Sequence, residues 1–273
     1  MPSLYVVATP IGNLEDITLR ALRILREVGL IAAEDTRRTR RLLSHYDIKT
    51  PMTSFYEHSK LTKLDYILNF LENKDVAIVS EAGMPGISDP GYELITAAID
   101  REIPVVPVPG PSAVVTALAV SGLPAERFTY IGFLPRKQGD RRKQLESVAA
   151  EPGVIVAFET PHRTQAALAD ILSVLGDRRI AVCRELTKLH EEIYRGTVSG
   201  AMAYFTGPRG EFTLIIEGNR EKEKPPEVKD IKERVAALVS EGASAREAVA
   251  ALAEETGVSR KELYRLFLEI KNK

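Results

Sequence analysis

Short runs of apolar, mostly β-branched residues alternate along most of this chain with longer segments whose apolar residues recur at helical spacing. Strands that alternate with helices build a largely parallel sheet covered by helices on both faces, so the alternation predicts the α/β class. The runs fall into two series, joined by the proline-rich segment PGPSAVVTALAVSG at 109–122. The expected strands are 4–9, 30–35, 75–80 and 103–108, then 128–134, 154–159, 179–186 and 211–218. The expected helices between them are 18–28, 38–46, 62–72, 91–101 and 161–175.

The two series predict two α/β domains, at 1–111 and 112–218. A charged, proline-containing linker at 219–228 leads to a small helical domain at 229–273, with helices at 231–239 and within 243–270. Ser244 and Ser259 fit helix N-caps, and Ser259 with Glu262 fits a capping box. The spacing is typical of a helix-turn-helix, but a packing subdomain or dimer contact explains it as well, so both interpretations stay open.

Composition limits the partners and the compartment. The 273-residue chain has a formal net charge of −1 at pH 7, so a polyanionic partner would have to meet local basic patches. The single cysteine, Cys183, excludes a disulfide framework and predicts a buried, inert thiol in a reducing compartment. The first residues lack the pattern of a signal peptide, and no apolar run approaches the roughly 18 residues of a membrane span. We therefore expect a cytoplasmic protein with no membrane contact.

The loops after the expected strands are rich in glycine, proline and charge. Ligands of parallel α/β sheets bind beyond the carboxyl ends of the strands, so these loops predict a shared cleft. The loop SEAGMPGISDPG at 80–91 is acidic and contains Pro85 and Pro90, which lack N–H groups, so it fits a phosphate cradle poorly. The four histidines have no metal-ligand spacing, and no nucleotide-binding glycine motif occurs, so we expect neither a metal site nor a phosphate-bearing cofactor.

Two basic segments lie beside this predicted cleft, RRTRRLL at 37–43 and LPRKQGDRRKQ at 134–144. The second is interpreted as a mobile loop at the cleft edge. Basic side chains there would bind phosphates of a nucleic acid, although a solvated loop is the common alternative for such a charge run. The candidate RNA-binding residues are Arg37, Arg136, Lys137, Arg141, Arg142, Lys143 and Arg163.

A family resemblance rests on an ordered set of motifs. In chain order they are LYVVATPIGNLEDITLRAL, EDTRRTRRLL, VSEAGMPGISDPG, VPGPSAVVTALAVSGL, GFLPRK, ETPHR, RELTKLHEE and GEFTLIIEG, between residues 4 and 218. They resemble the tetrapyrrole-methylase-like, class III S-adenosylmethionine methyltransferases, and within that superfamily the ribosomal RNA small subunit methyltransferase I family. That family 2′-O-methylates a cytidine in the decoding region of 16S rRNA. The third motif departs from the usual SDAGTP, since Glu81 replaces the Asp and Met84 replaces the Thr.

The resemblance implies S-adenosyl-L-methionine as cofactor, folded into the cleft between the two α/β domains. It also implies 16S rRNA of the small ribosomal subunit as substrate, and a homodimer. The cofactor-binding residues that it implies are Pro10, Gly83, Met84, Ile87, Ser112, Ala113, Phe133, Leu186, Glu211 and Phe212.

Catalysis would need the ribose hydroxyl in line with the methyl–sulfur bond, and a base to take its proton. Asp35, Glu159 and His162 are the candidates, while Arg37 and Arg163 fit phosphate binding better. Glu159 and Arg163 could equally form a structural ion pair. Two other functions remain open. A tetrapyrrole methyltransferase would share the fold but has no need of the polybasic segment, and a non-catalytic nucleic-acid-binding protein has no need of the cleft loops.

Overall fold

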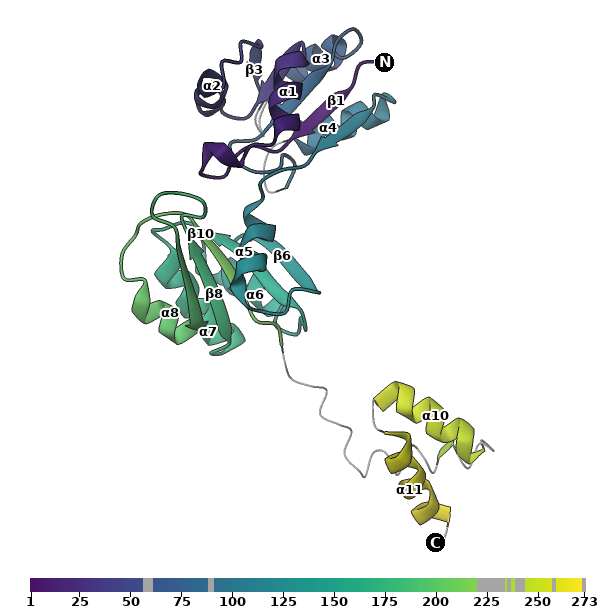
Figure 1. The fold of residues 1–273 in the computed structure, drawn as a ribbon. Coiled ribbons are helices and arrows are strands. Elements are labelled where there is room, and N and C mark those ends of the chain that lie inside the picture. The colour runs from purple at the N-terminus through teal and green to yellow at the C-terminus, as the bar shows by residue number, and fades with distance from the viewer. Residues whose placement is uncertain are drawn as a thin grey trace. The chain divides into compact units, whose positions relative to one another are not determined.

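The computed structural model describes residues 1–55, 61–87, 91–219, 234, 237–238, 244–256 and 259–271 of the chain (Figure 1). These residues belong to two compact units, Met1–Asn219 and Arg220–Lys273. The first unit contains two five-stranded sheets with their helices, and the described part of the second unit is helical. The predicted linker at 219–228 lies almost entirely outside the described residues, as does most of the predicted helix at 231–239.

The first sheet is wholly parallel and has the strand order β3-β2-β4-β1-β5. Its strands are short and largely buried, as expected for a sheet with helices on both faces. The register pairs Leu4 with both Val76 and Val105, so the carboxyl ends of the central strands share one edge. The strands are β1 (Leu4–Val7), β2 (Leu30–Ala33), β3 (Met52–Ser54), β4 (Val76–Val79) and β5 (Val105–Val108).

Alternate strand residues supply the two cores of this half. Ile31 and Ala33 pack with α1 and α2 on one face, whereas Leu30 and Ala32 pack with α3 and α4 on the other. Thr18 begins α1 by accepting a hydrogen bond from the backbone N–H of Ala21. The elements that connect the strands are η1 (Leu14–Asp16), α1 (Leu19–Glu27), α2 (Thr36–His45), α3 (Leu61–Phe70) and α4 (Tyr92–Asp100).

The second sheet is mixed and has the order β6-β7-β10-β8-β9. Strand β6 runs parallel to β7, whereas β10 runs antiparallel to both β7 and β8, and β9 is antiparallel to β8. Consequently β10 begins at the edge where β7 and β8 end. The strands are β6 (Phe128–Phe133), β7 (Val154–Glu159), β8 (Arg179–Arg184), β9 (Glu192–Thr197) and β10 (Phe212–Ile216).

Helices cover both faces of this sheet (Figure 1). One face packs against α6, α7 and α8, and the other packs against α5 through Val114, Ala117 and Leu118. Cys183 belongs to the second of these cores, where burial raises the pKa of its thiol to about 11. The predicted buried thiol is therefore confirmed. The helices are α5 (Ala113–Ser121), α6 (Gln138–Ser147), α7 (Thr164–Leu175) and α8 (Val198–Tyr204).

Two expectations about this unit are corrected. The segment 134–144 is not a mobile loop, because its larger part forms the start of α6. The edge strands β3 and β9 and the short helix α8 were not expected from the sequence. Each of them is short, and neither β3 nor β9 contains a fully buried residue that would have produced a clear apolar pattern.

In the second unit, α10 (Ala245–Thr256) and α11 (Arg260–Lys271) pack through a small apolar core of Ala248, Val249, Leu252, Leu263 and Phe267. Ser244 caps α10 in a reciprocal capping box with Glu247. Ser259 accepts a hydrogen bond from the backbone N–H of Glu262 at the start of α11, as expected of an N-cap. Among the described residues, no helix is long and apolar enough to cross a membrane.

Candidate active site

The carboxyl ends of the strands in the first unit surround a cavity of about 280 Å³, near the lower end of the range for small-molecule sites. Residues from both sheets line it. From the first half come the loop after β1, the start of α2, the loop after β4 and the start of α5. From the second half come the ends of β6 and β7, the turn after β8 and the start of β10. The lining residues are Ile11, Arg38, Glu81, Ala82, Gly83, Met84, Ile87, Ser112, Ala113, Val114, Phe133, Phe158, Glu159, Thr160, Pro161, Leu186, Glu211, Phe212 and Thr213.

This lining brings together all the predicted cofactor neighbours except Pro10. Pro10 directly precedes Ile11 in the loop after β1. The cavity wall is mostly apolar and carries three carboxylates, Glu81, Glu159 and Glu211, against one arginine. Each of these carboxylates is paired with a basic side chain, Arg38, Arg163 or Lys188, so the part of the wall that the structure describes has no surplus of basic groups with which to bind a polyphosphate.

The loop after β4 is joined to the loop after β1 by a pair of backbone hydrogen bonds. The N–H of Thr9 donates to the carbonyl of Gly83 and the N–H of Gly83 donates to the carbonyl of Thr9, each at 2.9 Å. Gly83 has a φ of +80°, a conformation that residues with a Cβ rarely adopt. The bridge holds the backbone of Gly83 and the side chain of Met84 at the cavity wall.

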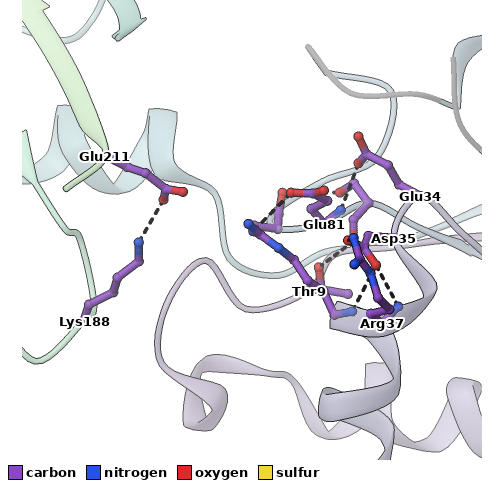
Figure 2. Close-up of polar contacts among 10 residues, drawn as sticks. Thr9, Glu34, Asp35, Arg37, Glu81, Lys188 and Glu211 are labelled. Atoms are coloured by element: carbon purple, nitrogen blue, oxygen red, sulfur yellow. Dashed lines mark hydrogen bonds and ion pairs between the residues drawn. The ribbon is translucent and has the colours of Figure 1, made fainter. Parts of the chain in front are cut away.

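An acidic cluster lies beside this loop (Figure 2). The backbone N–H of Glu81 donates to a Glu34 carboxylate oxygen at 3.0 Å, and the Glu81 carboxylate pairs with Arg38 at 3.1 Å. Burial, together with the nearby charge of Glu81, raises the pKa of Glu34 in spite of that backbone hydrogen bond. Arg38 is the one cationic side chain among the described residues that line the cavity.

Asp35 begins α2 by accepting hydrogen bonds from the backbone N–H groups of Arg37 at 2.7 Å and Arg38 at 3.3 Å. These bonds, with the charge of Arg37, lower the pKa of the Asp35 carboxyl. A capping carboxylate of lowered pKa is a weaker proton acceptor. Asp35 does not line the cavity, and neither does the exposed His162.

On the opposite wall, the turn after β8 contacts the loop after β1. The N–H of Asn13 donates to the Thr187 hydroxyl at 3.0 Å, and Gly12 lies so close that a Cβ would stand 2.7 Å from the same oxygen. Thr187 has a φ of +64°, which costs a β-branched residue roughly 1–3 kcal/mol. Figure 2 shows the ion pair between Lys188 and Glu211 that braces this turn against the start of β10.

Glu159 is the most buried of the three candidate bases, with a fully buried side chain at the end of β7. Its Oε1 accepts from the backbone N–H of Thr160 at 2.6 Å and pairs with Arg163 at 2.7 Å, so the structural ion pair considered above does form. Its Oε2 is buried and has no hydrogen-bond partner among the described residues. Arg163 also donates to the Thr160 hydroxyl and the Leu134 carbonyl, so its guanidinium is occupied within the protein.

The basic segment divides into exposed and buried side chains. Arg136, Lys137 and Lys143 are exposed, as RNA binding would require. Arg141 is only 3% exposed and pairs with the buried Asp170, so its prediction as an RNA contact is wrong. Arg142 is partly exposed and pairs with the same carboxylate.

Sequence reasoning missed Arg38, which lines the cavity, and chose its exposed neighbour Arg37. The two arginines are adjacent in the first turn of α2, and nothing in the sequence shows which of them faces the cavity. The other lining residues that were missed adjoin ones that were predicted. They are Ile11, Ala82, Val114, Phe158, Thr160, Pro161 and Thr213.

Two families match this sequence. The profile of the family described as Tetrapyrrole (Corrin/Porphyrin) Methylases matches residues 3–201, and that described as RsmI C-terminal HTH domain matches residues 227–271. Solved structures of the same fold include a uroporphyrin-III-C-methyltransferase from Thermus thermophilus, with a TM-score of 0.58 and 19% identity over 80% of this chain and 94% of that chain. A diphthine synthase has a TM-score of 0.62 and 13% identity over 78% and 89%. Such low identities establish the fold alone.

Curated relatives are similar over most of their length, and those described here are all named Ribosomal RNA small subunit methyltransferase I. The protein of Halalkalibacterium halodurans is 46% identical over 272 residues, covering 97% of this chain and 94% of that protein. That of Thermotoga maritima is 52% identical over 221 residues, covering 80% and 99%. That of Bacillus subtilis is 42% identical over 272 residues, covering 97% and 93%.

These matches confirm the predicted fold class, two α/β halves of tetrapyrrole-methylase type followed by a helical domain, and the predicted enzyme class. The chain is a methyltransferase and belongs to the ribosomal RNA small subunit methyltransferase I family.

Proposed function

We propose that this protein uses S-adenosyl-L-methionine to methylate the 2′-hydroxyl of a cytidine in the decoding region of 16S rRNA. The observation that carries the proposal is the cavity shared by both sheets, whose lining contains nearly every residue that the family resemblance assigns to the cofactor. The names of the relatives, which share 42–52% identity with this chain, supply the ribosomal RNA substrate.

The chemistry of the cavity wall fits this cofactor. A largely apolar wall, without a surplus of basic side chains among the described residues, suits a ligand with a sulfonium and no phosphate. The start of α5 at Ser112 and Ala113 supplies a helix N-terminus, which attracts a carboxylate such as that of the cofactor's amino-acid end. Met84, which replaces the usual threonine, contributes an apolar contact where a hydroxyl is expected.

The bound cofactor supplies a methyl carbon that is already electrophilic, so the protein mainly has to position the two reactants. Arg38 at the cavity wall and the exposed Arg37, Arg136, Lys137 and Lys143 would hold phosphates of the RNA on either side of the target ribose. Such phosphate contacts orient the substrate without reading its sequence.

Calorimetric titration with S-adenosyl-L-methionine tests the first half of the proposal. We expect one binding site per chain. The absence of binding would overturn the proposal that the protein uses S-adenosyl-L-methionine. Mapping of ribose methylation in 16S rRNA from a deletion strain tests the second half. We expect one cytidine in the decoding region to lose its methyl group, with restoration by purified enzyme acting on small subunits from that strain.

The base is tested by rates at saturating cofactor. Asp35→Asn, Glu159→Gln and His162→Ala each remove one candidate. Because general bases typically contribute about 10²–10⁴-fold, a loss of that size in one variant assigns the role to that residue. Wild-type rates in all three variants would show that none of these three residues is the base.

We also propose that the enzyme is a homodimer, as the family resemblance implies, and that it is cytoplasmic, as its single cysteine suggests. Light scattering of the purified protein tests the dimer, with a mass close to twice 30.1 kDa expected.

A further inference from the structure

The free oxygen of Glu159 is the polar atom in the cavity wall that most requires an explanation. The side chain is fully buried, and Oε1 is held by the N–H of Thr160 and by Arg163. Oε2 is equally removed from solvent, yet it has no hydrogen-bond partner among the described residues. A buried polar atom without a partner destabilises the fold, most of all when it is charged, so such atoms are uncommon unless a ligand satisfies them.

The surroundings indicate which ligand that is. Glu159 pairs across the sheet with Phe212 and follows Phe158, and all three line the cavity. Their neighbours in the lining include most of the residues assigned to the cofactor by resemblance, whereas Glu159 itself is not among the assigned residues. Glu159 is therefore part of the cavity wall; because Oε2 has almost no accessible surface, the side chain has to turn toward a ligand in order to meet it.

We propose that Glu159 is a cofactor-binding residue, whose Oε2 accepts a hydrogen bond from an N–H or O–H group of S-adenosyl-L-methionine. The inference rests on the proposed function for the identity of the cofactor. The donor groups available are the ammonium, the two ribose hydroxyls and the adenine amino group, and each of them can donate to a carboxylate. The Thr160 N–H and Arg163 both engage Oε1, so Oε2 is left for the ligand, and Arg163 itself does not line the cavity.

Substitution of Glu159 by Gln tests the proposal. In this variant the amide oxygen should stay at the Oε1 position, where it accepts the hydrogen bond from the Thr160 N–H. The amide NH₂ group then takes the place of Oε2, and it can only donate, so it cannot accept a hydrogen bond from the ligand. Charge-assisted hydrogen bonds contribute about 1.5–3 kcal/mol, so Kd for S-adenosylhomocysteine, measured by calorimetry, should rise roughly 10- to 100-fold. Since S-adenosylhomocysteine cannot transfer a methyl group, the result is independent of any role of Glu159 as a base.

Arg163→Met is the matched control. It removes the ion pair and leaves the free oxygen, so Kd should change by less than about threefold while the melting temperature falls. If Glu159 serves only the ion pair, the two variants will bind S-adenosylhomocysteine equally well, and that result overturns the proposal. If Glu159→Gln fails to fold, Glu159→Asp retains the charge but withdraws the oxygen, and unchanged affinity in that variant overturns the proposal as well.

Truncated ligands identify the donor. 5′-Methylthioadenosine keeps the ribose and adenine but lacks the ammonium. If Glu159→Gln weakens binding of this ligand as much as it weakens binding of S-adenosylhomocysteine, the hydrogen bond comes from the nucleoside. If it does not weaken binding of this ligand, the hydrogen bond comes from the ammonium. Failure of the wild-type protein to bind either ligand would contradict the proposed function itself, whereas wild-type binding with unaltered variants contradicts only the role of Glu159.

Discussion

At the scale of single residues, Gly12 is a position where the two halves of the cavity are in close contact. A Cβ at this position would lie 2.5 Å from Lys188 Cγ, 2.7 Å from the Thr187 hydroxyl and 2.8 Å from the carbonyl oxygen of Leu186. The last contact is with backbone, which cannot rotate away. Because Leu186 lines the cavity, any displacement of this turn reaches the ligand site.

Gly12→Ala should therefore lower both stability and cofactor affinity. Forcing an extra methyl group into a packed contact typically costs about 1–3 kcal/mol. Chemical denaturation and calorimetry with S-adenosyl-L-methionine measure the two effects. Gly139→Ala is the control, because a Cβ at Gly139 would meet no atom of the described residues within 4 Å, and alanine is the better helix former. Equal stabilities for the two variants would show that the contact at Gly12 relaxes without cost.

The sequence identified the ends of the strands better than it identified individual charges. Gly83, Ser112 and Phe212 were placed correctly at the cavity because motif and strand pattern agree at those positions. Arg141 was misjudged because its partner, Asp170, lies on a different helix, and a run of basic residues does not reveal which of them is buried. Tertiary pairing of that kind is invisible to spacing along the chain.

At the scale of elements, α6 is attached to α7 by one buried carboxylate. Asp170 accepts hydrogen bonds from Arg141 at 2.5 and 2.8 Å, from Arg142 at 2.8 Å and from Gln138 at 3.0 Å. Burial acts to raise the pKa of Asp170, but the bonds from Arg142, Gln138 and Arg141 outweigh it and the net pKa lies below 3.8.

Asp170→Asn should destabilise the first unit, because it leaves the buried Arg141 guanidinium without its counter-charge. Breaking one side of a buried ion pair typically costs roughly 3–5 kcal/mol. Denaturation at neutral pH measures the loss, and Asp140→Asn, which alters an exposed carboxylate on the same helix, is the control. Because the pKa of Asp170 is lower in the folded than in the unfolded protein, its carboxylate stabilises the fold at every pH above the unfolded pKa. This stabilisation is lost as the pH falls through the pKa of the folded protein. The difference between wild type and variant should therefore shrink as the pH falls below the ordinary aspartate value of 3.8.

The same helix marks the limit of prediction from local pattern. The long strands and helices of both series were predicted to within a few residues, since burial imposes a clear period on them. Only Arg141 and Leu145 of α6 are buried, and the charged surface with Gly139 is typical of a loop. Its helical state depends on contacts with α7, as that of the short strand β3 depends on pairing with β2.

At the scale of the whole molecule, the roles of the two compact units can be tested by truncation. The Thermotoga maritima relative is also named Ribosomal RNA small subunit methyltransferase I. The 221 residues that align with this chain make up 99% of that relative, so it is shorter than this chain. We expect a variant that ends at Asn219 to bind S-adenosyl-L-methionine like the full chain and to bind small ribosomal subunits more weakly. Calorimetry and subunit pull-down measure these properties. Unchanged subunit binding together with loss of the dimer would favour a packing role for the helical unit.

The buried thiol of Cys183 has a practical consequence. It is the chain's single cysteine, it is 1% exposed, and its pKa of about 11 keeps it protonated at neutral pH. Maleimide reagents should therefore leave the unmodified protein unlabelled, as if it contained no cysteine. New cysteines placed at exposed sites, one on α1 and one on α8, would accept a dye pair selectively. Energy transfer between the dyes could then report, in single molecules, whether the two halves of the cavity close on the cofactor.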